Sequence, residues 1–156
     1  MNLFTVSFFG HRRIINYQSV EESVDKVVRM LIRDKEYVDF LVGRDGDFDQ
    51  IVSSAIIRAK KYVFAENSSH ICVFPYQRAI YTNNQEAFEN YYDEIEICAE
   101  SSLAHPKRAI QIRNRCMVDR SDLVVFFTQN NYGGAYQTLR YAVKQGKEII
   151  NLAELQ

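Results

Sequence analysis

Two adjacent glycines, Gly133 and Gly134, lie between an apolar run and an amphipathic segment in the stretch YGGAYQTLRY, residues 132–141. Paired glycines in front of a helix let an anion approach backbone N–H groups and the positive end of the helix. The pair therefore predicts a phosphate site. A loop that needs glycine only for its backbone conformation would show the same pattern.

A second glycine turn, FFGHRR, follows an apolar run near the start of the chain. Gly10 allows a sharp turn, and His11 and Arg12 come directly after it. Basic side chains beside free backbone N–H groups suit a phosphate or another anion. The alternative is a solvated surface turn in which His11 only hydrogen-bonds to the backbone.

The third turn, GRDGDFDQIV, contains Gly43, Gly46 and Asp47 at the start of an expected helix. Asp47 can cap free amides and complement the helix dipole, or it can accept a hydrogen bond from a ribose hydroxyl. The sequence leaves both interpretations open. The letters DGD resemble part of a calcium loop, but the glutamate expected at the twelfth position is absent, so no metal site is predicted.

A helix that begins at Pro106 supplies further basic residues. Its four arginines are Arg108, Arg113, Arg115 and Arg120. An arginine at the carboxyl edge of a sheet would bind an anion, whereas arginines elsewhere on the helix would form a solvated face. The arginines thus add weight to the paired glycines as an anion site.

These turns must be positioned by the alternation of apolar runs and helical patterns along the chain. Strands apolar on both faces and separated by helices indicate a parallel sheet covered on each side. We therefore predict a Rossmann-like, doubly wound α/β domain over residues 1–156, with a mostly parallel sheet of about five strands. In such sheets the ligand lies beyond the carboxyl ends of the strands, where the glycine turns fall. The expected strands are residues 3–9, 38–42, 70–74, 122–128 and 148–152.

Residues 76–105 have the least regular pattern. We expect a helix from about Gln85 followed by a loop, and we assign the aromatic side chains to packing rather than to stacking on bases.

Composition limits the possible function classes. The chain has 156 residues and a formal net charge of -1, which gives no reason to expect nonspecific nucleic-acid binding. Nucleic acid is therefore not an expected partner, and no cofactor is implied. The cysteines Cys72, Cys98 and Cys116 form no CxxC pair, so neither a disulfide framework nor a zinc cage is predicted. Without a membrane-length apolar run or a signal sequence, a soluble cytoplasmic protein is expected.

The stretches RNRCMVDRSDLVVFF and GGAYQTLRYA resemble the SLOG superfamily, the Rossmann-like group of the LOG phosphoribohydrolases, DprA and YpsA-like proteins. FFGHRR and GRDGDFDQIV are similar to the short YpsA-like bacterial members. The resemblance implies a Rossmann-like fold and, because members commonly self-associate, a homo-oligomer. It does not select one function, since the superfamily contains hydrolases, DNA-binding proteins and nucleotide-sensing domains.

LOG enzymes cleave the N-glycosidic bond of nucleoside 5′-monophosphates with an arginine in R-K-x-x-M and a glutamate in P-G-G-x-G-T-x-x-E. Arg113 and Met117 match the first motif, with Asn114 in the lysine position, and Gly133 and Gly134 match the paired glycines of the second.

The glutamate of the second motif has no counterpart. Its position falls on Arg140 without a gap, or on Tyr141 if Thr138 is aligned with the threonine. Neither residue can replace a carboxylate, which stabilises the oxocarbenium-like transition state and activates water.

We therefore expect a binding module for a nucleotide or a nucleotide-derived ligand, acting as a sensor or regulatory component without LOG-type catalysis. The alternative is an N-glycosidase or deoxyribosyltransferase-like enzyme that uses Arg113 and another acid. The candidate acids are Asp45, Asp47, Asp49, Glu94 and Glu96, and the sequence does not select among them. Binding of single-stranded DNA is disfavoured by the near-neutral charge. The expected ligand-binding residues are Gly10, His11, Arg12, Gly43, Gly46, Asp47, Arg113, Asn114, Gly133, Gly134 and Thr138.

Overall fold

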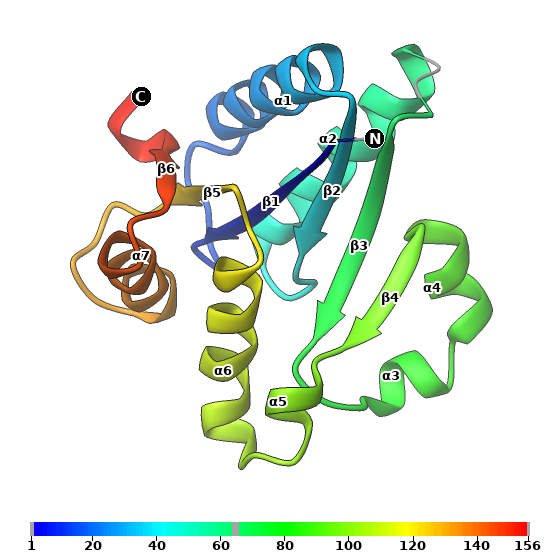
Figure 1. Ribbon diagram of the computed structural model, residues 1–156, viewed down its shortest axis with the longest axis vertical. Helices are drawn as coiled ribbons and strands as arrows, with labels where there is room; N and C mark the ends of the chain where they lie inside the picture. Colours follow the sequence, from blue (N-terminus) through cyan, green and yellow to red (C-terminus); the bar gives the residue numbers. More distant parts are fainter. Residues whose placement is uncertain (1, 64–65, 156) are drawn as a thin grey trace.

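A computed structural model describes residues 2–63 and 66–155. They form an all-parallel sheet of six strands in the order β4-β3-β2-β1-β5-β6 (Figure 1). The doubly wound α/β fold is confirmed, and the strand number is six rather than about five. The strands are β1 (Leu3–Gly10), β2 (Tyr37–Val42), β3 (Ser68–Phe74), β4 (Glu94–Ile97), β5 (Leu123–Phe127) and β6 (Glu148–Asn151).

Helices cover both faces of the sheet (Figure 1). Phe8 and Phe40 belong to the core on the side of α1 and α2, whereas their neighbours Phe9 and Leu41 belong to the core beneath α6 and α7. Successive residues of a strand point to opposite faces, so the unbroken apolar runs reflect burial on both sides. The long helices are α1 (Tyr17–Asp34), α2 (Asp47–Val63), α6 (Pro106–Asp119) and α7 (Gly134–Lys144).

The additional strand, β4, comes from the segment that the sequence pattern assigned to a loop. It has only four residues, EIEI, and it extends the sheet beside the end of β3, where Cys72 pairs with Ile95. A run this short and this acidic carries no clear strand signal, because its pairing partner supplies most of its stabilisation. An edge position tolerates its glutamates.

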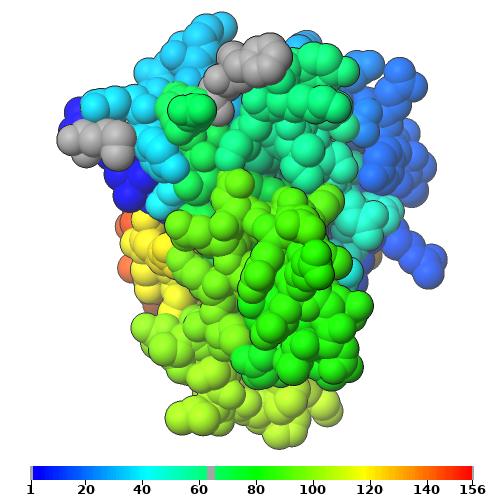
Figure 2. Space-filling model, turned by 90° about the vertical axis from the view of Figure 1, so that its right-hand side faces the viewer, coloured from blue at the N-terminus to red at the C-terminus, as the bar shows by residue number. Residues whose placement is uncertain are grey.

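Short helices surround this edge, and Figure 2 shows their residues, in green, on the outer surface of the molecule. One of them begins at Gln85, as expected. Phe88 and Tyr92 are buried and stack on each other with ring centroids 6.3 Å apart, so these two aromatics do serve packing. The short helices at this edge are α3 (Ala79–Thr82), α4 (Gln85–Tyr91) and α5 (Ala99–Ser102), whereas the short 3-10 helix η1 (Leu152–Leu155) follows β6 at the opposite edge of the sheet.

The strand order reverses at β1, which pairs with β2 on one side and with β5 on the other. Ligands of doubly wound proteins bind in the crevice at such a reversal point. Within residues 2–63 and 66–155, none of the helices has the length and apolar character needed to span a bilayer.

Candidate functional site

A cavity of about 650 Å³ lies at the carboxyl ends of β1, β2 and β3, against α6 and the start of α7. It brings together the three glycine turns and the arginine helix, which are far apart in the sequence. The expected residues that line the cavity are Gly10, His11, Arg12, Gly43, Arg113, Asn114, Gly133 and Gly134.

The remaining expected residues, Gly46, Asp47 and Thr138, do not line the cavity. They contact residues next to it or in its wall. Gly46 has a φ of 108°, and a Cβ there would lie 2.9 Å from the Cα of Arg12. The Asp47 carboxylate accepts a hydrogen bond from the Ile14 N–H at 2.9 Å, and the Asp47 N–H donates to the Arg12 carbonyl at 2.8 Å. Asp47 thus fixes the β1–α1 turn, so the geometry favours a structural role over contact with a ribose.

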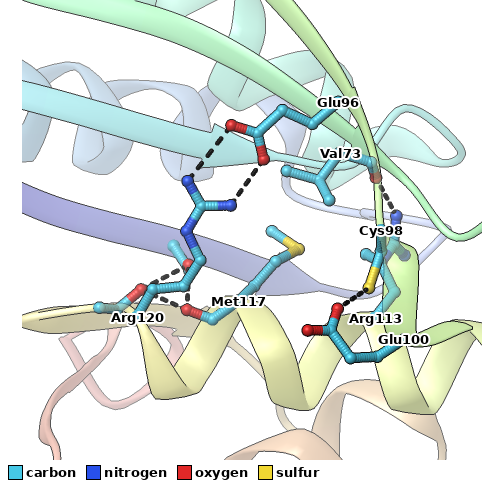
Figure 3. A network of polar contacts seen from close by, with 9 residues as sticks. Val73, Glu96, Cys98, Glu100, Arg113, Met117 and Arg120 are labelled. Carbon is cyan, nitrogen blue, oxygen red and sulfur yellow. Dashed lines mark hydrogen bonds and ion pairs between the residues drawn. The ribbon is translucent and has the colours of Figure 1, made fainter.

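Arg113 is held by a chain of hydrogen bonds that begins at the glycine pair. Thr138, which is fully buried, donates from Oγ1 to the Gly134 carbonyl at 3.0 Å and accepts from Asn114 Nδ2 at 3.1 Å. Arg113 then donates from Nε to Asn114 Oδ1 at 2.9 Å. Its Nη1 donates to the Val73 carbonyl at 2.7 Å (Figure 3). Asn114 and Thr138 therefore position the guanidinium of Arg113 in the cavity wall.

The first turn of α7 offers backbone donors to the cavity. Gly133, the N-cap residue, has a φ of 93° and no side chain to bond the free amides. A Cβ at Gly133 would meet nothing within 4 Å, and one at Gly134 would approach only Gln111 Nε2, at 3.3 Å. The first N–H groups of a helix lack partners within the helix and carry its positive dipole end, so this turn suits an anion.

His11 connects the β1–α1 turn to the loop that carries these glycines. Its Nε2 accepts a hydrogen bond from the Gln129 N–H at 2.9 Å, and its ring contacts Phe127 edge-on. Burial lowers the pKa of His11, which keeps the ring neutral and able to accept that bond. His11 therefore joins two walls of the cavity, and its bonded nitrogen is not free to act as a base.

Asp49 lies in the cavity wall but is absent from the predicted ligand-binding residues. Its Oδ2 would be 2.9 Å from a Cβ at Gly43, so the carboxyl group lies directly over the end of β2. Burial and nearby Asp45 raise the pKa of Asp49 to about 7, although Arg113 and Arg12 oppose the shift. A carboxyl group with a strongly shifted pKa in a cleft is typical of functional sites. The sequence shows only one more acid in a first helical turn, where capping is the ordinary role.

The charges around the cavity favour an anionic ligand. Arg78 pairs with Asp45 at 2.8 Å, and Arg44 lies over the Phe88 ring at 4.7 Å. No hydrogen bond or salt bridge joins the Arg12 side chain to another residue within 2–63 and 66–155. Arg78 had no signal in the sequence, because its segment has no regular pattern. The charged residues that line the cavity are the arginines Arg12, Arg44, Arg78 and Arg113 and the aspartates Asp45 and Asp49.

A second cavity of about 390 Å³ shares Arg44 and Asp49 with the first. Its walls include the aromatic residues Tyr17 and Tyr91, which are 40% and 43% exposed and so present ring surface to a ligand. Side chains of this kind offer flat apolar surface with polar tips. The anion-favouring cavity thus adjoins an aromatic one, with Asp49 between them.

The positions aligned with the LOG glutamate lie outside both cavities. Arg140 is exposed, and the Tyr141 hydroxyl donates to Asp119 Oδ1 at 2.7 Å. Neither places a carboxylate beside Arg113.

No protein-family model matches the chain, and no curated protein matches it in sequence. The fold, however, matches solved structures. DNA processing protein A from Helicobacter pylori, described for its single-stranded DNA binding mode, is 19% identical with a TM-score of 0.64, over 94% of this chain and 63% of that chain.

Two further structures show the same similarity. DNA processing protein A (DprA) from Streptococcus pneumoniae is 17% identical with a TM-score of 0.68, over 94% of this chain and 49% of that chain. The protein TM1055 is 17% identical with a TM-score of 0.61, over 94% of this chain and 72% of that chain. The chain thus has the Rossmann-like fold of DprA, as its resemblance to the SLOG superfamily implied, while the YpsA-like assignment stays a prediction.

The expectation that nucleic acid is an unlikely partner is wrong. It rested on the net charge of the chain, yet a protein described by its single-stranded DNA binding shares this fold. Net charge also averages over the surface, whereas the cavity alone contains four arginines and two aspartates. Local charge, rather than the sum over the chain, decides which ligands a cleft attracts.

Proposed function

We propose that this protein binds a nucleotide or a nucleotide derivative in the cavity at the carboxyl ends of the strands. The observation that carries the proposal is the convergence of a hydrogen-bonded Arg113 with the amide-rich glycine turn of α7. Arginine and free helical amides together are the ordinary protein receptor for a phosphate. The proposed role is that of a ligand sensor or regulatory module.

The two adjoining cavities suit the two ends of a nucleotide. We assign the phosphate to Arg113, Gly134 and Arg12, and the base to the aromatic cavity beside Tyr91. Asp49 belongs to both cavities, so a sugar between base and phosphate would pass it. Its carboxyl group is then the natural partner for a ribose hydroxyl.

A specific observation also favours single-stranded DNA as a second candidate ligand. The similar protein from Helicobacter pylori is described for its single-stranded DNA binding, and this chain covers 63% of that protein. A nucleotide of a DNA strand carries the same phosphate and base as a free nucleotide. The same cavity would then accept one nucleotide of the strand.

The proposal is tested by calorimetry on protein freed of co-purified ligand, against nucleoside monophosphates, ADP-ribose, cyclic nucleotides and a short oligothymidylate. Arg113→Gln should weaken binding about 10- to 100-fold, because it removes charge-assisted hydrogen bonds. Arg108→Gln is the matched control, since Arg108 is exposed on the same helix and does not line the cavity. Absence of binding by every probe would overturn the proposal.

The same samples separate binding from catalysis. Chromatography of the nucleotides after incubation should show no release of free base, because the aligned glutamate is missing. Release that is abolished in Asp49→Asn and retained in Arg108→Gln would instead identify an N-glycosidase with Asp49 as its acid.

A further inference from the structure

Two of the three cysteines lie close to a carboxylate where α5 packs against the C-terminal half of α6. Cys98 immediately precedes α5, Glu100 lies within α5, and Cys116 lies in α6. Their sulfur and carboxylate oxygen atoms all lie within 4.8 Å of one another. The sequence did not predict this cluster, because Cys98 and Cys116 lie 18 positions apart and spacing along a chain does not determine distance in space.

Backbone contacts fix the ligand-bearing segment. The Cys98 N–H donates to the Phe74 carbonyl at 2.9 Å, and the buried Ser101 hydroxyl donates to the Pro75 carbonyl at 2.5 Å. The Cys98 thiol donates to Glu100 Oε2 at 3.4 Å (Figure 3). The start of α5 is therefore anchored to the end of β3, and the thiol already points at the carboxylate.

The cluster has access to solvent and carries a free negative charge. A cavity of about 520 Å³ includes Cys98, Glu100 and Cys116 among its lining residues. The neighbouring Glu96 is engaged by Arg120 at 2.6 Å, whereas no salt bridge within the described part of the chain joins Glu100 to a cation. Glu100 thus remains available as a ligand, and the cavity leaves space for a water molecule.

We propose that Cys98, Glu100 and Cys116 bind a thiophilic divalent cation, for which Zn²⁺ is the best match. Zn²⁺ takes cysteine sulfur and carboxylate oxygen in tetrahedral sites, whereas Mg²⁺ and Ca²⁺ prefer oxygen alone. Three protein ligands and one water complete the tetrahedron. Binding converts both thiols to thiolates, so two protons leave for each ion bound and the carboxylate enters already ionised.

The geometry requires only a small contraction. A tetrahedral zinc with Zn–S bonds of about 2.3 Å separates its two sulfurs by roughly 3.8 Å. The ligand atoms, already within 4.8 Å of one another, therefore have to approach by about 1 Å at most. A rotation of the exposed Glu100 side chain and a small shift of Cys116 suffice.

The ion would join α5 to α6 at the turn of α6 that follows Arg113. Cys116 comes three residues after Arg113, and Met117 lines both this cavity and the larger one. An ion at this place would hold the helix that presents Arg113. The ion site itself does not depend on the ligand of the larger cavity.

The test uses the full chain, reduced and stripped of metal with a chelator, and titrates it with Co²⁺ and then Zn²⁺. We expect one equivalent of Co²⁺ with the absorption of a tetrahedral thiolate complex, displacement by Zn²⁺, and release of about two protons per ion in weak buffer. Zn²⁺ should also raise the melting temperature, because binding favours the folded state.

Variants separate this site from chance binding to thiols. Cys98→Ser and Cys116→Ser should lose the thiolate–cobalt absorption, and Glu100→Gln, an exposed and structurally mild change, should weaken the affinity at least about tenfold. Cys72→Ala is the matched control, because Cys72 is buried in the core on the other face of the sheet and should leave binding intact. Failure to saturate at one equivalent would overturn the proposal. Binding unchanged in Cys98→Ser, or a Cys98–Cys116 disulfide in a protein whose reduced form binds no Co²⁺, would do the same.

Discussion

Asp49 combines a position in the cavity wall with a cost in stability. Its carboxyl group lies in the cavity wall over Gly43, and its pKa is raised to about 7 chiefly by burial. Because the folded pKa lies above the ordinary value of 3.8, the unfolded chain loses this proton first as the pH rises. The ionised carboxyl group therefore destabilises the folded state increasingly from about pH 4 to pH 7, and fully above that.

We predict that Asp49→Asn stabilises the ligand-free protein, by on the order of 1–2 kcal/mol at pH 8 and by little at pH 4. The same change should weaken nucleotide binding, because the amide is a poorer acceptor for a ribose hydroxyl. Thermal and urea unfolding at the two pH values measure the first effect, and calorimetry measures the second.

Asp47→Ala provides the contrast on the same helix. Its carboxylate bonds to the Ile14 N–H, so its removal should lower stability. Equal stabilisation by both substitutions would show that general charge, rather than the cavity, explains the Asp49 effect.

His70 predicts how the protein responds to acid. Its Nε2 is 2.8 Å from the Ser53 hydroxyl, and burial lowers its pKa from 6.5 to about 4 despite the opposing charge of Asp93. The neutral ring is therefore favoured in the folded state. The stabilisation is complete above the unfolded value of 6.5 and is lost as the pH falls toward 4.

The loss attributable to His70 should reach about 2 kcal/mol between pH 6.5 and pH 5, at roughly 1.4 kcal/mol per pH unit. Urea unfolding across this range should show a shallower decline for His70→Gln than for the wild type. Arg108→Gln, a change at an exposed side chain that does not titrate in this range, is the control and should leave the slope unchanged. Parallel slopes for the wild type and His70→Gln would contradict the prediction.

At the residue scale, the sequence singled out residues for which both the residue type and the position in a turn or at a helix end indicated a binding role. Arg113 and the glycine pair were singled out because a motif and a helix start coincided, and the structure places them in one cavity. Asp49 was only one of several candidate acids and Arg78 was not singled out, because an acid in a first helical turn and an arginine in an irregular segment have common structural explanations. Their importance comes from burial and from neighbours that only the folded chain brings close.

At the scale of elements, the glycines of the cavity have different reasons for being glycine. A Cβ at Gly10 would lie 2.3 Å from the ring of Phe48, in the packed junction of β1 and α2. Gly134 faces only the flexible Gln111, at 3.3 Å. One glycine is therefore required by packing, and the other leaves space that a ligand can use.

We predict that Gly10→Ala destabilises the protein by about 1–3 kcal/mol through overpacking. Gly134→Ala should change stability by less than about 1 kcal/mol, because alanine favours the helix. Its methyl group should nevertheless weaken binding of a phosphate at the α7 amides. Unfolding midpoints test the predicted loss of stability in Gly10→Ala, and calorimetric affinities test the predicted loss of binding in Gly134→Ala. Similar losses of affinity in both variants, with stability unchanged in both, would contradict the two different roles.

The elements themselves were predicted from the sequence except at the edge beyond β3. The other five strands each contain a run of mostly apolar residues, because β1, β2, β3 and β5 are buried on both faces and β6 packs its isoleucines against the sheet. β4 had no such run, because its backbone pairing with β3 and not its own side-chain pattern makes it a strand. A parallel pairing between distant segments leaves no local signal.

For the whole molecule, the near-neutral net charge conceals a basic cleft. A ligand phosphate in this cleft should show salt-dependent affinity despite the formal net charge of -1. For a single-stranded oligonucleotide, each neutralised phosphate contributes a slope of about -0.7 in log affinity against log salt.

We predict a slope of about -0.7 to -1.4 for a short oligothymidylate, because the cavity has space for one or two phosphates. Fluorescence anisotropy between about 50 and 200 mM salt measures it. A slope several times steeper would show that a strand runs along a larger basic surface, and a slope of zero would place the phosphate elsewhere.

The expected homo-oligomer stays a prediction at this scale. Several large apolar side chains are exposed, among them Ile15 at 95% and Leu103 at 97%. Analytical ultracentrifugation of the reduced protein measures whether the chain self-associates.

Gly10 and Gly134 are under different constraints, so their substitution in homologues would have different meanings. Any side chain at position 10 would clash with the Phe48 ring, whatever the protein binds. An invariant glycine at position 10 would therefore say nothing about the ligand. Position 134 is under no such steric constraint, and glycine should persist there only in lineages that still bind a phosphate. Substitutions at position 134, and not at position 10, would mark the lineages that have exchanged or lost the ligand.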